Sequence, residues 1–280
     1  LRRFHDQYHN ETLIANVGVV GKSYADKLLV GITLGQNRAD IQNGARMKEF
    51  VYGKRFRRGN TIMPSIKYQK DNLFVEGLDL RVNGNFNLGY EQTVDTAGVK
   101  YNWYGEYYRP EGKVSEQELT MYKYKNNLGV VAANLNYKLT DQHAFTVNNV
   151  YTTFNRKGED PLNLSSESYK QPRKTKKNVI GLGYKFDYND AWSTSLFVKE
   201  FHQQTTSFRE EEGPGGWGSK VYIPIYNTHD ALGYGLASSY FVTEKVQIKA
   251  SYEKSLRMPD HDELFGNDGL SMLGNMELKP

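Results

Sequence analysis

Hydrophobic and polar residues alternate with a period of two along much of this chain. In residues 74–90, the even positions are mainly apolar, and the odd positions are mainly polar or glycine. Successive side chains of a strand point to opposite faces. The segment therefore predicts a strand with one apolar and one strongly polar face, well above the usual length of ~5–6 residues.

The same alternation recurs along the chain. Further segments with one apolar face are 13–19, 28–34, 177–188, 231–241 and 246–256. Residues 144–155 and 192–201 alternate imperfectly, which leaves their register open. These segments predict an all-β fold.

The connections between these segments are alternately short and long. The short ones lie near 25–26, 70–72, 140–142, 189–190 and 243–244, and contain Asp or Asn side chains that favour tight turns. The long, polar ones lie near 37–60, 91–122, 157–174, 207–224 and 257–280. Transmembrane β-barrels have short turns on one side and long loops on the other, so the pattern predicts about ten antiparallel strands of such a barrel.

Aromatic residues gather beside the short connections. They are Tyr68, Phe74, Tyr137, Phe145, Phe186, Tyr188, Trp192, Tyr240 and Phe241. Barrels carry aromatic girdles at the membrane interface. Ordinary packing of rings in a soluble sheet is the alternative.

Composition agrees with this fold class. The chain has 280 residues, 38% of them hydrophobic, and a mean hydropathy of -0.69, with no apolar run long enough for a spanning helix. Its 21 Tyr and 13 Phe argue against disorder. The absence of cysteine excludes disulfides and thiolate chemistry, and a net charge of +4 does not call for a nucleic-acid partner.

The C-terminal segment carries a more specific signal. It resembles a recurrent segment of TonB-dependent outer-membrane receptors, in which a barrel strand runs into Arg-x-Pro, Glu-Leu-Phe-Gly and Gly-Asn-x-x-Leu-Lys-Pro. The matching residues are Tyr252, Arg257, Pro259, Glu263, Leu264, Phe265, Gly266, Gly274, Asn275, Leu278, Lys279 and Pro280.

The resemblance implies a barrel of about 22 strands with a plugged lumen, in the bacterial outer membrane. It also implies active uptake of a scarce nutrient, driven by the TonB energy-transducing complex through the plug. We interpret residues 1–280 as part of such a barrel, and we expect the plug before Leu1 and further strands after Pro280. The substrate (iron chelate, haem, cobalamin, oligosaccharide or peptide) and an accessory surface lipoprotein remain open. A passive porin or export barrel, and a soluble β-rich binding or adhesion protein, are the alternatives.

Two groups of side chains are the candidates for contact with plug or substrate. On the polar faces, the predicted lumen-facing residues are Asp79, Arg81, Lys185, Lys249 and Glu253. In the long loops, the candidate ligand-binding aromatics are Tyr104, Tyr107, Tyr108 and Trp217. We expect the polar wall to contact the plug before the substrate.

Two basic clusters fall in predicted extracellular loops. One comprises Arg46, Lys48, Lys54, Arg55, Arg57 and Arg58, and the other Lys170, Arg173, Lys174, Lys176 and Lys177. They suit anionic lipopolysaccharide or an anionic ligand. Simple solubilising charge is an equal alternative.

No enzyme site is predicted, because the chain has no nucleophile-elbow motif. Residues 260–263 (Asp-His-Asp-Glu) contain metal-ligand types, but neighbours on one short stretch rarely converge on an ion. We therefore predict no metal and no cofactor.

Overall fold

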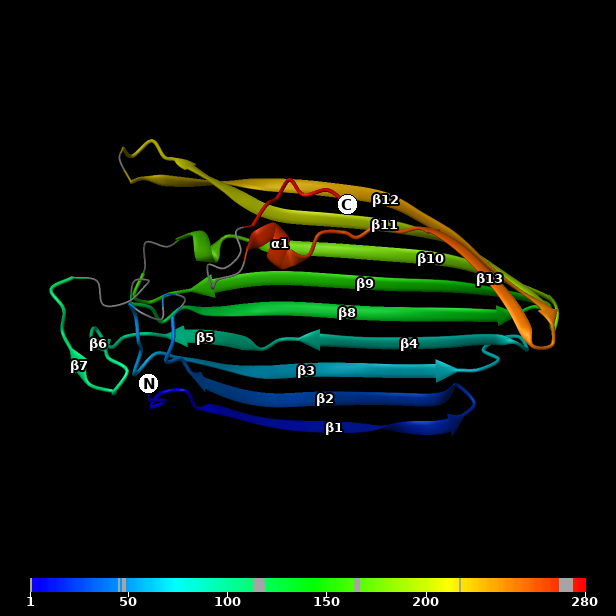
Figure 1. Ribbon diagram of the computed structural model, residues 1–280, viewed down its shortest axis with the longest axis horizontal. Helices are drawn as coiled ribbons and strands as arrows, with labels where there is room; N and C mark the ends of the chain where they lie inside the picture. The colour runs from blue at the N-terminus through cyan, green and yellow to red at the C-terminus, as the bar shows by residue number, and fades with distance from the viewer. Residues whose placement is uncertain are drawn as a thin grey trace.

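The computed structural model describes residues 2–44, 46, 49–112, 119–163, 167–216, 218–266 and 274–280. Its main feature is one antiparallel, 11-stranded sheet (Figure 1). The strands are β1 (Tyr8–Lys22), β2 (Ala25–Asp40), β3 (Phe56–Lys70), β4 (Leu78–Asn87), β5 (Tyr90–Val94), β8 (Lys123–Lys138), β9 (His143–Glu159), β10 (Arg173–Asn189), β11 (Trp192–Glu212), β12 (Lys220–Thr243) and β13 (Val246–Lys254). This confirms the predicted all-β class.

Nearly all strands pair with their sequence neighbours, as in a meander. The order is β1-β2-β3-β4-β8-β9-β10-β11-β12-β13, and β5 bridges β3 and β8. A separate two-stranded sheet pairs β6 (Lys100–Tyr101) with β7 (Tyr107–Tyr108). The remaining elements are the 3-10 helix η1 (Glu167–Lys170) and the helix α1 (His261–Phe265). No helix in the described ranges is long and apolar enough to cross a membrane.

The predicted strand over residues 74–90 is interrupted in two places. Residues 71–77 form a turn, with positive φ at Asn72 (52°) and Gly77 (80°), so Phe74 lies in the turn rather than on a strand. A second break separates β4 from β5. A Cβ at Gly89 would lie 2.0 Å from the Asn60 carbonyl oxygen, so only glycine permits this close approach.

The strands also extend further towards the long loops than predicted. The predicted connection over 207–224 is wrong, because β11 continues to Glu212 and β12 begins at Lys220. Likewise, Arg173, Lys174, Lys176 and Lys177 belong to β10, and Arg57 and Arg58 belong to β3, rather than to loops. Antiparallel pairing continues there without an apolar face, because backbone hydrogen bonds suffice to hold the ribbon.

The register places the apolar positions of neighbouring strands side by side. Leu34, for example, lies between Leu13 and Ile62 in the ladder, and Leu182 pairs with Val147 and Val198. We call this surface the apolar face. The side chains of the apolar face are exposed, with exposed fractions of 76% at Val17, 51% at Leu182 and 62% at Tyr252. The opposite surface, which we call the polar face, carries the hydrophilic positions.

Aromatic side chains cluster at the short-turn end of the sheet. Phe186 lies 5.1 Å from His143 and 6.3 Å from Trp192, and Trp192 lies 5.8 Å from Tyr188, between ring centroids. These rings come from three neighbouring strands, β9, β10 and β11. The cluster matches the position of a membrane-interface girdle.

Candidate functional site

All five residues predicted to face a lumen lie on the polar face. Arg81 pairs with Asn134 and Asp79 with Asn136, while Lys249 pairs with Ser239. Glu253 accepts a hydrogen bond from Lys199 at 3.1 Å, and Lys185 donates one to Asp187 at 2.6 Å. The face therefore carries mixed charges, and all five predicted residues except the half-buried Asp79 are exposed.

A row of amides runs between these charged residues. Asn134 donates to Asn148, Asn136 donates to Asn134 at 2.5 Å, and the Thr146 hydroxyl donates to Asn136 at 2.8 Å. Asn134, Asn136, Asn148 and Thr146 were not among the residues predicted to face the lumen. The asparagines repeated at odd positions of 83–87, on the same face, were the available signal.

The family-like segment lies on the polar face, near its long-loop end (Figure 1). We call residues 257–266 the strap. Its anchor is Arg156 of β9, only 5% exposed, which donates to the Gly266 carbonyl oxygen at 3.1 Å and to Asp262 at 3.2 Å. A third bond, from Nε at 2.8 Å, reaches Asn126 on β8. One guanidinium thus ties the strap to two strands of the wall.

Further apolar and polar contacts hold the strap on the wall. Met258 and Leu264 are buried, and Phe154 of β9 stacks on His261 with ring centroids 4.2 Å apart. The fully buried Gln203 of β11 donates to the Pro259 carbonyl oxygen at 3.2 Å. The strap is thereby fixed to β9 and β11.

An internal ion pair fixes the shape of the strap. The Arg257 guanidinium donates two hydrogen bonds to Glu263, at 2.9 and 2.8 Å, and the Asp260 N–H donates a third at 2.9 Å. These bonds, from Arg257 first, lower the pKa of Glu263 to about 2. The carboxylate also completes a capping box with Asp260 at the start of α1.

The rest of the family-like segment lies close by. Asn275 donates its backbone N–H to the Glu263 carbonyl oxygen at 2.8 Å, and Asn227 of β12 donates to the Met276 carbonyl oxygen at 2.9 Å. Leu278, Lys279 and Pro280 follow without a regular element. Pro259, Leu264 and Phe265 belong to the strap itself.

The acidic and His residues of the strap have separate main partners, although His261 and Asp262 lie within 3.6 Å of each other. His261 stacks on Phe154, Asp262 meets Arg156, and Glu263 meets Arg257. Over the ranges that the structure describes, no group of three His, Asp or Glu side chains is placed to hold a metal ion.

Three of the four predicted loop aromatics lie around one small hairpin. Tyr107 and Tyr108 form β7, and Tyr104 lies in the turn before it, all of them exposed. Tyr101 of β6 is half-buried between Phe4 and Tyr107, with centroid distances of 6.1 and 5.9 Å. Burial raises the pKa of the Tyr101 hydroxyl, with a further contribution from Tyr107. The fourth residue, Trp217, lies outside the described residues.

The loops at this end have their own anchor in Asp160. Burial by itself would raise the pKa of this carboxyl, but hydrogen bonds from Thr120, Asn163 and the N–H groups of Met121 and Leu162 together lower it. The carboxylate therefore holds residues 119–121 against 160–163. Sequence reasoning missed this residue, because a lone loop Asp gives no signal of its partners.

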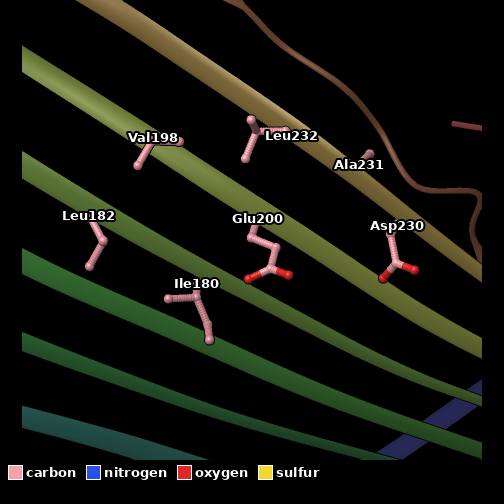
Figure 2. A pocket seen from close by; sticks show the side chains of 7 residues that line it. All are labelled: Ile180, Leu182, Val198, Glu200, Asp230, Ala231 and Leu232. Atoms are coloured by element: carbon pink, nitrogen blue, oxygen red, sulfur yellow. The ribbon is translucent and has the colours of Figure 1, made fainter.

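The apolar face has a hollow of about 480 Å³ on β10, β11 and β12. Figure 2 shows its lining side chains, which are Ile180, Leu182, Val198, Glu200, Asp230, Ala231 and Leu232. Asp230 bonds His202 at 2.6 Å. The carboxylates of Glu200 and Asp230 mark where this face stops being apolar towards the long loops.

One family model matches nearly the whole chain. It is described as the β-barrel of TonB-dependent receptor-like proteins, and it matches residues 3–280. The chain belongs to the TonB-dependent receptor β-barrel family. No curated protein matches it.

Membership in the TonB-dependent receptor family assigns the chain to outer-membrane receptors and transporters rather than to a family of enzymes. It also confirms the resemblance of the C-terminal segment and the barrel class predicted from alternation. In barrels of the TonB-dependent receptor family, the apolar face of the wall meets lipid, and short turns and long loops mark the two ends.

Proposed function

We propose that this chain forms part of the wall of a bacterial outer-membrane transporter that imports a scarce nutrient with energy from TonB. The observation that carries the proposal is the opposition of two surfaces. One is an open apolar face, and the other is a polar face that carries the family's own segment as a strap. A soluble sheet would bury its apolar face against another layer.

Residues 1–280 form the barrel wall, and the plug is the part that moves. In this proposal, Asp79, Arg81, Lys185, Lys249 and Glu253 contact the plug, whose rearrangement opens a path along the polar face. The open edges of the sheet, at β1 and β13, need further strands, because unpaired backbone groups in lipid cost several kcal/mol each.

In this proposal the nutrient binds at the long-loop end of the wall. Tyr104, Tyr107 and Tyr108 offer exposed rings on a short hairpin held by Tyr101 and Phe4. Rings fixed in this way can stack on a planar or sugar-like ligand at low entropic cost. The substrate class stays open among chelates, haem, cobalamin, oligosaccharides and peptides.

The proposal is tested on the full-length protein in its native envelope. We expect it to leave the outer-membrane fraction only with detergent, and to change its gel migration on boiling. We also expect uptake of the nutrient to stop when the proton-motive force is dissipated or TonB is removed. Uptake that persists without TonB would indicate a passive porin, and solubility in plain buffer would indicate a soluble binding protein.

A further inference from the structure

Four lysines lie together on the outward surface, beyond the apolar face and towards the long loops. They are Lys125 on β8, Lys157 on β9, and Lys174 and Lys176 on β10, and we call them the lysine patch. Lys125 pairs directly with Lys157. Lys174 pairs with Asn155 and is therefore diagonal to Lys157. Direct pairs have Cβ atoms about 4.5–5.5 Å apart and diagonal ones about 7–8 Å.

All four side chains are exposed, and the described part of the chain gives none of them an ion pair. Of the carboxylates nearest in the ladder, Glu159 lies opposite Lys123 and diagonal to Lys125, and in the described part of the chain it forms no ion pair with any of the four lysines. Glu210 pairs with Lys220 at 2.5 Å. The residue opposite Lys176 is Gln204, and Glu200 lies four residues away from Gln204 along β11.

Some basic side chains elsewhere are paired with a carboxylate of the same chain. Near the short turns, Lys70 pairs with Asp26 at 3.2 Å and Lys138 with Asp141 at 2.7 Å. At the long-loop end, Arg38 pairs with Asp40 at 3.1 Å. Like charges placed directly opposite each other destabilise a sheet. The lysine patch therefore has the charge distribution of a site whose anion comes from outside the chain.

The surroundings of the patch limit what that anion can be. Towards the apolar face come two polar outward pairs, Asn127–Asn155 and Gly129–Thr153, and then the first apolar pair, Val131–Tyr151. A molecule with its charge on the lysines would thus pass two rows of small or polar side chains before its apolar part meets the apolar face. The patch also points away from the polar face and the strap, so a nutrient on its way through the lumen does not reach it.

We propose that the lysine patch binds the phosphate-bearing headgroup of an outer-leaflet lipid, whose acyl chains lie along the apolar face. The inference rests on the proposed function, because that function places the apolar face in lipid and the long loops outside. Ammonium groups on a wall at headgroup depth attract anionic lipid over neutral lipid. Substitution of the patch is expected to leave the barrel itself intact, because all four side chains are exposed.

The experiment uses the full-length protein in zwitterionic detergent, with bisphosphorylated lipid A and its dephosphorylated form as probes. The test variant is K125Q/K157Q/K174Q/K176Q. The matched control is K22Q/K27Q/K67Q/K245Q, which removes the same charge from four exposed lysines near the short turns. We expect the test variant to bind bisphosphorylated lipid A at least about tenfold more weakly than wild type. The control variant and wild type should bind it equally, and both should prefer it to the dephosphorylated lipid.

Three outcomes would overturn the proposal. They are equal losses in the test and control variants, unchanged binding in the test variant, and displacement of the lipid by millimolar inorganic phosphate, which would indicate a site for free anions. Heat-modifiable migration is read on the same samples. A wild type that lacks it contradicts the proposed function, whereas intact migration with unchanged lipid binding contradicts only the lysine patch.

Discussion

Arg257 and Glu263 form a two-pronged ion pair that closes the strap on itself, with both hydrogen bonds under 3 Å. Both residues belong to the segment that resembles the receptor family. Their pairing fixes the shape of the strap. The strap then accepts hydrogen bonds from Arg156 and Gln203 of the wall.

This pair predicts an acid-sensitive strap. The pKa of Glu263 is lowered from 4.5 to about 2, so its contribution to stability is fully present above about pH 4.5 and is lost as pH falls towards 2. We expect amide hydrogen exchange in residues 260–266, corrected for its intrinsic pH dependence, to accelerate over that interval. In E263Q the exchange should already be faster at neutral pH and should show no further step of acceleration between about pH 4.5 and 2. A step of the same size in E263Q would assign the effect to other carboxyls.

Substitution of Arg156 should release the strap from the wall without unfolding the sheet. R156M removes the donors to Gly266, Asp262 and Asn126, and a lost hydrogen bond to a charged group costs about 1.5–3 kcal/mol. We expect urea unfolding in lipid vesicles to show a loss in that range, with faster hydrogen exchange in the strap. R109M, at an exposed position, is the control and should leave both unchanged. Protection of the strap in R156M would show that Arg156 is not its anchor.

The two faces of β11 can be tested with adjacent residues. Leu196 points to the apolar face and Ser195 to the polar face. Because arginine on the lipid side of a barrel costs about 2–4 kcal/mol near the membrane centre, we expect that loss for L196R. S195R should cost much less. Unfolding free energies in vesicles measure both, and equal costs would mean that the apolar face does not meet lipid.

Gly235 makes room for an aromatic ring on the polar face. A Cβ at this position would lie 2.3 Å from Cζ of Phe197 on the paired strand and 2.9 Å from the Tyr252 carbonyl oxygen. Overpacking of this kind typically costs about 1–3 kcal/mol, which we expect for G235V. In F197A/G235V part of that loss should return, because the ring no longer occupies the space. A double-mutant cycle in urea measures the coupling, and strictly additive effects would contradict the contact.

The sequence by itself determined the class of fold and its two faces. A period of two in hydrophobicity is a local property of each strand, so residues 177–188 and 231–241 could be read without knowledge of their partners. Short turns rich in Asp and Asn are likewise local. The motif from Arg257 to Pro280 indicated the family, because its elements occur in order along one stretch of chain.

Only the tertiary structure decided where these local pieces meet. The break between β4 and β5 depends on the approach of Gly89 to Asn60, a residue on another strand. The position of the strap depends on Arg156, more than a hundred residues away in sequence. The lysine patch exists only because register places Lys125 opposite Lys157 and brings Lys174 beside them. Such contacts arise from cross-strand pairing, whose register is set by all the neighbouring strands together rather than by the residues of any one segment.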